Sequence, residues 1–578
     1  MNIKTKSNTL RKIKPSSWII ILYILLIPVI NTNHHNWADN EGVIKWDIKS
    51  YYAYLPAAFI YHDISLNFIN ENPQKFNKWI WPINTPTRKK GIITSMGLSV
   101  LYAPFFAIAH TVALLNPQYQ ADGYSLPYHY ALAFSTFFYF ILGLFVLRKI
   151  LRQFYPEKIV AITLFFVGFG TNLLYYVTYE AAMSHGYNFV LIVLFLYFLI
   201  KWHKSHTVKH TVILGLLGGI ISLIRPTNIL ILILIPLWEV YNLKSFKESI
   251  IDLLSKWKLI LLMFFSFILV WIPQFIYWKY ISGQFLYFSY GETGGKFFFL
   301  NPQLSDFLFS YKKGWYVYTP LMLFATIGIY FLYQQKKKYA VAIAFLLIIY
   351  VYILSSWWSW WFGGAFGQRS MVDLYGILAL PFAAIMFSLL KRKWIYKISV
   401  SLVVLFVFFN LFQTRQYKNG AIHYWWMTKE AYWETFLKIN PTCKYLKIHL
   451  IPDYEKARQG IYIAIPEHDK NSEITDSMLV ERIIKDYKKN YLLIDSLKSI
   501  SLKTDSILKN YAFELIKNKK AENYFNQLKI DYYMQYIDKC YDWRLEVEKM
   551  AKKKNVSYNE MLLIEAKRVF KTYSEKYD

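Results

Sequence analysis

Long apolar runs are the feature that most constrains this chain. After a basic leader, the sequence has one short apolar run and ten longer ones, each near the roughly 20 residues that a helix needs to cross a bilayer. We therefore expect an all-α, polytopic membrane protein with about eleven transmembrane helices. The predicted spans are 18–30, 127–147, 159–178, 184–200, 209–224, 227–242, 257–278, 315–333, 339–356, 371–390 and 396–413.

The composition agrees with this class. Of the 578 residues, 55% are hydrophobic, 20% are aromatic and only 18% are charged, which is too apolar for an ordinary soluble multidomain protein. Glycine and proline number 23 and 19, too few for a fibrous or disordered chain. The two cysteines exclude a disulfide framework and a multi-cysteine metal site.

The net charge of +29 would suggest nucleic-acid binding in a soluble protein. Here most Lys and Arg residues lie in short breaks between apolar runs, and those between the predicted spans gather in the loops that this topology places inside. The positive-inside rule explains this distribution, so no nucleic-acid partner is expected. The same rule places the N-terminus in the cytoplasm and the C-terminal part on the outer side.

Two apolar runs need separate interpretation. The first, 18–30, is followed by Asn31-Thr32-Asn33, which lacks a small-x-small cleavage site, so we interpret it as an uncleaved anchor. The run 92–112 is also apolar, but counting it as a crossing would turn the basic segment 148–158 outward. We therefore predict a juxtamembrane or half-buried helix there.

The topology divides the chain into three predicted parts. They are a membrane domain with a long first outer loop, a linker on the outer face, and a small helical extramembrane domain, at 1–413 (loop 34–91), 414–474 and 475–578. Apolar residues at helical spacing support the helical domain. Cys443 and Cys540 both fall on the outer side and could pair.

Asp47 is the first candidate for chemistry. It precedes Tyr51-Tyr52-Ala53-Tyr54-Leu55-Pro56, a pattern that suits a short interfacial helix. A carboxylate in an apolar, aromatic setting can act as a general base on a hydroxyl, because partial desolvation moves its pKa toward the working pH. The alternative is an ordinary N-capping aspartate of that helix.

An ordered set of segments carries a family resemblance. The segments are Tyr51 to Pro56, Gly91 to Phe106, Met183-Ser184-His185-Gly186-Tyr187, Ile224-Arg225-Pro226-Thr227-Asn228, Lys313 to Pro320 and Trp360 to Arg369. With the acid in a long first outer loop, they resemble the GT-C glycosyltransferases, which include protein O-mannosyltransferases, the aminoarabinose transferases of lipid A and many bacterial relatives. The likeness spans about residues 1–425.

The resemblance implies an activity and a place for it. Such enzymes move a sugar from a polyprenyl-phosphate carrier to an acceptor hydroxyl on the non-cytoplasmic side, by inverting displacement. We therefore expect a multi-pass protein of the bacterial plasma membrane with an outward active site. Its partners would be the lipid-linked donor, a glycan, lipid or protein acceptor, and membrane lipids.

The resemblance also assigns two acids. Asp47 matches the first-loop acid and would be the catalytic base, and Glu180 matches by position a second acid between the third and fourth spans. Glu180 would orient the acceptor or bind a divalent metal, although the sequence requires no metal or other cofactor. The alternative for Glu180 is a helix-end acid that hydrogen-bonds to a tyrosine.

A departing lipid phosphate requires positive charge nearby. Arg225 and Arg369 are outward arginines at span ends, and arginine offers a planar fork that suits phosphate. His185 and Lys313 are further phosphate-binding candidates. The alternatives are arginines that snorkel to lipid head groups, a structural histidine, and a lysine that anchors the following span.

Aromatic residues near these positions are candidates for lining the substrate site. They are Tyr51, Tyr52, Trp360 and Trp361. The tryptophans could hold a sugar or a prenyl chain, but the aromatic belt that borders most membrane proteins explains them equally well.

Two other functional classes stay open from sequence. A transporter or flippase predicts charged residues along a path through the membrane, whereas the candidates here gather at one face. A non-catalytic scaffold predicts that Asp47, Glu180 and Arg369 can be replaced without loss. A polysaccharide polymerase or ligase is a related enzymatic alternative.

Overall fold

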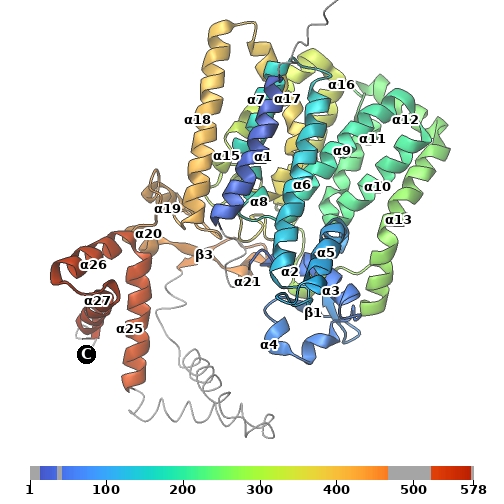
Figure 1. Cartoon of the computed structure of the whole chain (residues 1–578). Coiled ribbons are helices and arrows are strands. Elements are labelled where there is room, and N and C mark those ends of the chain that lie inside the picture. Colours follow the sequence, from blue (N-terminus) through green and yellow to red (C-terminus); the bar gives the residue numbers. More distant parts are fainter. Residues whose placement is uncertain (1–12, 35–41, 467–521, 575–578) are drawn as a thin grey trace, which may run out of the picture. The chain divides into compact units, whose positions relative to one another are not determined.

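The computed structural model describes residues 13–34, 42–466 and 522–574 (Figure 1). The first part of the predicted helical domain, residues 475–521, lies outside the described residues. The chain divides into two compact units. The first comprises Met1–Thr414 and Arg458–Ile461, and the second comprises Arg415–Ala457 and Tyr462–Asp578.

The first unit is built from apolar helices. In the described part of the chain, eight helices are long and apolar enough to cross a membrane, which confirms the expected all-α polytopic fold class. They are α1 (Pro15–His34), α5 (Gly97–Leu115), α6 (Leu126–Leu151), α9 (Ser184–Ser205), α13 (Trp257–Ser282), α16 (Leu321–Ser355), α17 (Tyr375–Leu389, preceded by the 3-10 turn η4, Arg369–Leu374) and α18 (Lys393–Lys418).

Several shorter elements complete this unit. They are α2 (Asp47–Tyr52), α3 (Tyr54–Phe59), η1 (Asn67–Asn70), α4 (Pro73–Phe76), β1 (Pro82–Asn84), β2 (Lys90–Ile92), α7 (Glu157–Phe169), α8 (Leu173–Val177), α10 (Val208–Ile224), η2 (Pro226–Ile233), α11 (Leu234–Leu237), α12 (Leu243–Ser255), η3 (Ser289–Thr293), α14 (Leu304–Phe309) and α15 (Trp315–Tyr318). Strands β1 and β2 pair antiparallel, with Ile83 opposite Gly91.

Some predicted spans are interrupted or joined, so the number of eleven crossings stays a prediction. The run 159–178 is split into α7 and α8, and the run 227–242 begins with the 3-10 helix η2 and continues as α11. Pro226 favours such a break because it has no backbone N–H to donate. The runs 315–333 and 339–356 mostly form the single helix α16, which is kinked at Lys336. Hydropathy shows how long an apolar segment is, and it does not show where the helix is interrupted or kinked.

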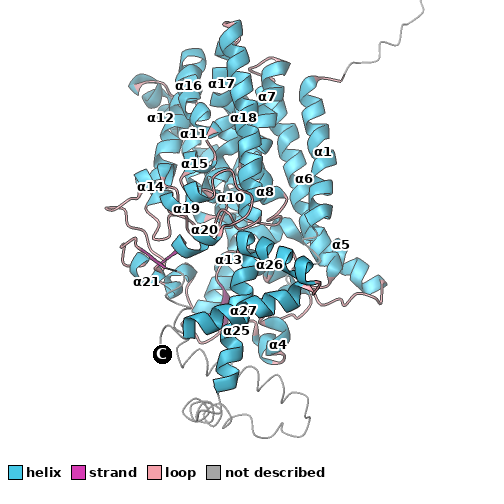
Figure 2. Ribbon diagram, turned by 90° about the vertical axis from the view of Figure 1, so that its left-hand side faces the viewer, coloured by secondary structure: helices cyan, strands magenta, loops and turns pink. Residues whose placement is uncertain are grey.

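Helix α5 corresponds to the predicted juxtamembrane run 92–112. Figure 2 shows α5 lying across the lower end of the helix bundle rather than along it. Its first residue, Gly97, packs against the C-terminal end of α10, where a Cβ would lie 2.6 Å from the Ile224 nitrogen. By length and composition alone α5 could also cross a membrane, so its placement at the boundary stays a prediction.

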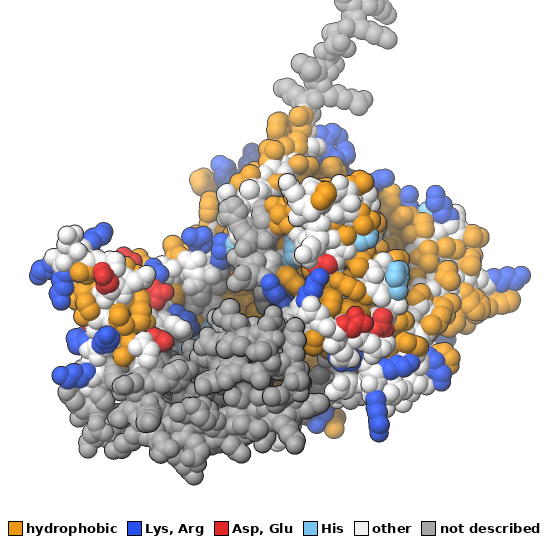
Figure 3. Space-filling model, turned by 60° about the horizontal axis from the view of Figure 1, so that its bottom comes forward, with side chains coloured by type: hydrophobic (Ala, Val, Ile, Leu, Met, Phe, Trp, Pro, Cys, Tyr) orange, Lys and Arg blue, Asp and Glu red, His pale blue; other side chains and the backbone are white. Residues whose placement is uncertain are grey.

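The core of the first unit lies around α9 and α17. In each of these two spans 83% of the apolar window is buried, against 22% in α13 and α18. Figure 3 shows a broad field of hydrophobic side chains on its right-hand flank, and α13 exposes Phe265 and Leu269. The central helices are thus surrounded by protein, and the peripheral helices present apolar surface.

The second unit combines short elements with three helices. The elements are α19 (Lys429–Glu434), α20 (Cys443–Ile448), β3 (Leu450–Pro452), α21 (Tyr454–Ala457), β4 (Ala464–Pro466), α25 (Glu522–Lys539), α26 (Tyr541–Lys554) and α27 (Tyr558–Ser574). The three C-terminal helices share an apolar core that includes Ile537, Val547 and Met561. A disulfide joins Cys443 to Cys540, so most of the predicted linker belongs to this unit.

The disulfide should stabilise the second unit. It links cysteines that are 97 residues apart, and closing such a loop typically contributes about 2–4 kcal/mol. Adding reductant to the purified protein should therefore lower the unfolding temperature of this unit, as followed by thermal denaturation. The Cys443→Ser variant should start at the lower temperature and not respond to reductant. Two free thiols in folded protein purified without reductant would contradict this pairing.

Candidate active site

Six charged or titratable side chains gather where element ends meet in the first unit. We call this set, Asp47, Glu180, His185, Arg225, Arg369 and Asp373, the polar cluster. Asp47 begins α2, Glu180 lies in the turn between α8 and α9, and His185 is in the first turn of α9. Arg225 separates α10 from η2, and η4 supplies the last two. Helix ends leave backbone groups unpaired, which makes these positions suited to polar chemistry.

Asp47 and Arg369 form an ion pair across the cluster. Arg369 Nη2 lies 2.9 Å from Asp47 Oδ2, and the two side chains are 16% and 40% exposed. The N-cap of α2 is Trp46, and no side chain caps this helix. Asp47 is therefore not the N-capping residue that the sequence allowed, and its carboxylate faces a guanidinium instead.

The loop before Arg369 is held in place by side chains that hydrogen-bond to its backbone. Gly367 has a φ of +60°, and a Cβ there would lie 2.9 Å from Tyr318 Cβ, so the position requires glycine. The Asn172 amide donates to the Phe366 carbonyl at 2.9 Å, and Phe366 N donates to the Tyr176 hydroxyl at 3.0 Å. The break between α7 and α8 thus places a polar side chain where it fixes the loop that presents Arg369.

Glu180 lies beside this ion pair. The Tyr175 hydroxyl donates to Glu180 Oε1 at 3.2 Å, which matches the alternative of a tyrosine-bonded acid. The same carboxylate also interacts electrostatically with Arg369, Lys45 and Asp47, which places it within the cluster. Burial raises the pKa of Glu180 above its ordinary value, although Arg369 and Lys45 act in the opposite direction.

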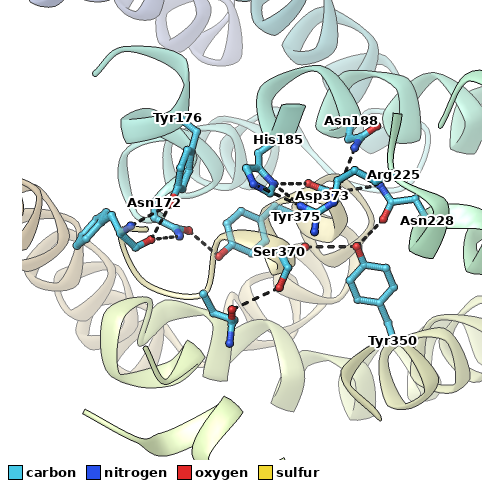
Figure 4. Close-up of polar contacts among 12 residues, drawn as sticks. Asn172, Tyr176, His185, Asn188, Arg225, Asn228, Tyr350, Ser370, Asp373 and Tyr375 are labelled. Atoms are coloured by element: carbon cyan, nitrogen blue, oxygen red, sulfur yellow. Dashed lines mark hydrogen bonds and ion pairs between the residues drawn. The ribbon is translucent and has the colours of Figure 1, made fainter. Parts of the chain in front are cut away.

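The other half of the cluster is centred on Asp373, which has no exposed surface (Figure 4). Its carboxylate accepts from Asn228 Nδ2 at 2.7 Å and from Asn188 Nδ2 at 3.2 Å. His185 Nδ1 lies 2.9 Å from Asp373 Oδ1, and Arg225 Nε lies 3.9 Å from Oδ2. A buried carboxylate persists only with such partners, because an unpaired charge in an apolar interior is costly.

His185 connects Asp373 to Arg225. A carboxylate only accepts and a guanidinium only donates, so Nδ1 must carry the proton that faces Asp373. Arg225 Nη1 lies 3.0 Å from Nδ1 and 3.3 Å from Nε2, so the guanidinium contacts both ring nitrogens of His185. His185 thus lies between Asp373 and Arg225 and positions the guanidinium, and its direct contact with a phosphate stays a prediction.

Lys313 and Lys312 are both buried. The Lys313 ammonium donates to the Ala365 carbonyl, in the loop that leads to Arg369. Burial lowers the pKa of Lys313 to about 7, with Glu180 acting against the shift and Arg369 adding to it. Lys313 therefore supports the loop, and its role as a phosphate contact stays a prediction.

The four aromatic residues predicted to line the substrate site have different surroundings in the structure. Tyr51 interacts electrostatically with Asp47, Arg225 and Arg369, so it lies between the two halves of the cluster. Tyr52 instead donates to the Gly123 carbonyl at 2.6 Å. Trp360 and Trp361 are buried, with the Lys312 ammonium 4.8 and 3.3 Å from their ring centroids. Tyr51 is thus the one of the four that the structure ties electrostatically to the cluster.

Asp373 and its amide partners were not among the residues predicted from sequence. Asp373 is an acid inside the predicted span 371–390, and an ionisable residue within an apolar span is by default a candidate for function. The sequence therefore contained a signal that could have identified Asp373. Asn228 and Asn188 carried no comparable signal, because an uncharged amide at a span end has many ordinary uses. Tyr350, whose hydroxyl donates to Asn228 Oδ1 at 2.6 Å, carried none either.

A metal site needs several His, Cys, Asp or Glu side chains close together. In the parts of the chain that the structure describes, no three His, Cys, Asp or Glu side chains gather closely enough to hold a metal ion. Asp47 is paired with Arg369, and Asp373 is surrounded by donors. These residues do not form a metal-binding set, and the divalent metal considered from sequence stays a prediction.

Comparisons with known proteins add little to this description. No family model matches the sequence, and no curated protein matches it. One similar solved structure is the archaeal oligosaccharyltransferase AglB from Archaeoglobus fulgidus with an inhibitory peptide and a dolichol-phosphate, at 12% identity and a TM-score of 0.41, covering 76% of this chain and 58% of that chain. Another is an Archaeoglobus fulgidus oligosaccharyltransferase tethered to an acceptor peptide, at 14% identity and a TM-score of 0.37, covering 78% and 60%.

This chain spans about three fifths of the length of those two structures. We therefore infer function from the polar cluster itself.

The buried lysine should make stability depend on pH. The pKa of about 7 for folded Lys313 lies below the ordinary lysine value near 10.4, so between these pH values only the unfolded chain holds the proton. The free energy of unfolding should then rise with pH in this window, by up to about 1.4 kcal/mol per pH unit. Lys313→Met should reduce the rise between pH 8 and 9, measured by thermal denaturation of purified protein.

An exposed lysine provides the control for this prediction. Lys258→Met removes a lysine from the surface of α13 and should leave the pH dependence as in the wild type. Identical slopes for the wild type and Lys313→Met would show that Lys313 does not have the lowered pKa.

Proposed function

We propose that this protein transfers a sugar from a polyprenyl-phosphate-linked donor to an acceptor hydroxyl at the outer face of a bacterial plasma membrane. The observation that carries the proposal is the Asp47–Arg369 ion pair, with Glu180 and Arg225 in the same cluster. It combines a partly exposed carboxylate with two guanidinium groups at the ends of apolar helices. Glycosyl transfer from a lipid phosphate needs a base for the acceptor hydroxyl and positive charge for the departing phosphate, and this cluster offers both.

The two arginines suit a phosphate that is attached to a lipid. Arg225 and Arg369 follow or begin apolar elements, and each keeps a small exposed fraction, 13% and 16%. A guanidinium binds phosphate oxygens through two parallel N–H donors, and these bonds are stronger than neutral ones. A polyprenyl chain would remain with the apolar helices while its phosphate reaches this pair.

In the proposed reaction Asp47 acts as the general base. Its carboxylate accepts the proton of the acceptor hydroxyl as that oxygen attacks the anomeric carbon of the sugar. The bond from the anomeric carbon to the phosphate oxygen breaks, and its electron pair stays on the phosphate. Arg225 and Arg369 stabilise the additional negative charge that develops there. Glu180 orients the acceptor, and the anomeric configuration inverts.

Two features support an outward site. Disulfides persist in oxidising compartments, and the second unit contains the Cys443–Cys540 disulfide. The spans α17 and α18 are consecutive, and two crossings return the chain to the side from which it started. Arg369 before α17 and the tail after α18 are then on the same side.

Replacing the proposed base should remove the activity. Asp47→Asn keeps the size of the side chain but cannot accept the proton, so transfer should fall by about 100-fold or more. The measurement is the glycan profile of native cells that carry a deletion, the wild type or Asp47→Asn at matched membrane expression. The variant should lack the same glycan that the deletion lacks.

The control variant is Asp122→Asn. Asp122 forms an ion pair of the same 2.9 Å length with Lys75, outside the polar cluster, so its replacement should leave the glycan profile unchanged. A wild-type profile from Asp47→Asn would reject base catalysis and favour the scaffold or transporter classes.

A further inference from the structure

The two arginines of the cluster have different surroundings. Arg225 is held by groups with almost no exposed surface: His185 is 1% exposed and Asp373 is 0% exposed. Arg369 is held by Asp47, whose side chain is 40% exposed. One guanidinium therefore has a buried support, and the other has a partner that water can reach.

The buried support of Arg225 is itself fixed. Asn188 and Asn228 both donate to the Asp373 carboxylate, and these bonds occupy the oxygen that does not face His185. His185 binds one nitrogen of Arg225 and leaves most of the five guanidinium donors for another ligand. Nε of Arg225 lies 3.9 Å from Asp373, beyond hydrogen-bond length, so the network positions the guanidinium without using all of its donors.

The pair between Arg369 and Asp47 is easier to exchange. Water reaches Asp47, whose side chain is 40% exposed, and would solvate that carboxylate once the pair separates. Arg369 is only 16% exposed, so it keeps a counter-charge only if another anion takes the place of Asp47. A phosphate offers the guanidinium two oxygens in a geometry that matches its fork. Arg369 could therefore leave the carboxylate for a phosphate at small cost.

We propose that Arg225 is the fixed anchor for the donor phosphate, positioned by Asp373 and His185, and that Arg369 exchanges Asp47 for that phosphate. This inference rests on the proposed function. The exchange frees the Asp47 carboxylate to accept a proton only after the donor has bound. Asp373 and His185 are positioning residues in this scheme, because they act through Arg225.

The charge balance of the reaction favours this order. The donor phosphate is a diester with one negative charge, and breaking the bond to the sugar leaves a monoester with a second. When Arg369 contacts the phosphate, it stabilises that added charge. When it contacts Asp47 instead, it lowers the basicity of the carboxylate that must accept the proton. The same guanidinium thus hinders proton transfer before donor binding and assists departure of the phosphate after it.

The test is binding of sugar-free polyprenyl phosphate to the purified full-length protein in detergent. Asp47→Asn removes the competing carboxylate, so the affinity for this lipid should rise by about threefold to tenfold although transfer is lost. The double variant with Arg369→Gln should lose this gain. Asp122→Asn, which breaks the ion pair with Lys75, should bind as the wild type does.

The positioning role of Asp373 has its own readout. Asp373→Asn should weaken binding by about tenfold in the wild-type background and have little further effect when Arg225 is already Gln. It should also raise the KM for the donor more than the KM for the acceptor. Equal effects in both backgrounds would indicate a general structural role, and unfolding temperatures identify variants that fail to fold.

The outcomes separate this inference from the proposed function. Unchanged affinity in Asp47→Asn, with weakened binding in Arg225→Gln, overturns the exchange and leaves the phosphate site intact. No binding by the wild type, or equal binding by the wild type and Arg225→Gln, overturns both. Tighter binding by Asp47→Asn that depends on Arg369 supports the exchange.

Discussion

A carboxylate that has no exposed surface can remain in an apolar bundle only when donors surround it. Asp373 meets this requirement through donors from several elements: the two amides of Asn188 and Asn228, the imidazole of His185, and the nearby guanidinium of Arg225. The interaction joins the ends of α9, α10 and η4 at one point. Without it the two central spans would bury an unpaired charge, and Arg225 would lose its support.

Interruptions in the helices bring these side chains together. A continuous helix pairs its backbone N–H and C=O groups with each other, so only its side chains can contact other elements. An interrupted helix also presents unpaired backbone groups and polar side chains to its neighbours within the bundle. The break before α8 places Asn172 against the Phe366 carbonyl, and the break at Pro226 places Arg225 and Asn228 beside η4. Gly367 allows the last loop its left-handed turn. The polar cluster therefore lies where regular helix is absent.

Much of the candidate site could be predicted from the sequence because its members have unusual local settings. Asp47, Arg225 and Arg369 are charged residues beside long apolar runs, and each proved to lie in the cluster. Trp360 and Trp361 had an equally clear setting, yet they are buried against Lys312. Whether these tryptophans are buried depends on the loops that pack against them. The local sequence around the pair does not show which loops those are.

The sequence by itself determined the membrane class, the approximate positions of the apolar helices and the charged residues at their ends. These are local properties, since hydropathy and charge need only a short window. The tertiary structure alone decided which ends meet: that Arg369 pairs with Asp47, and that Asp373 holds His185 against Arg225. Such pairings depend on how helices far apart in the chain pack together, and packing is set by side-chain shape across the whole bundle.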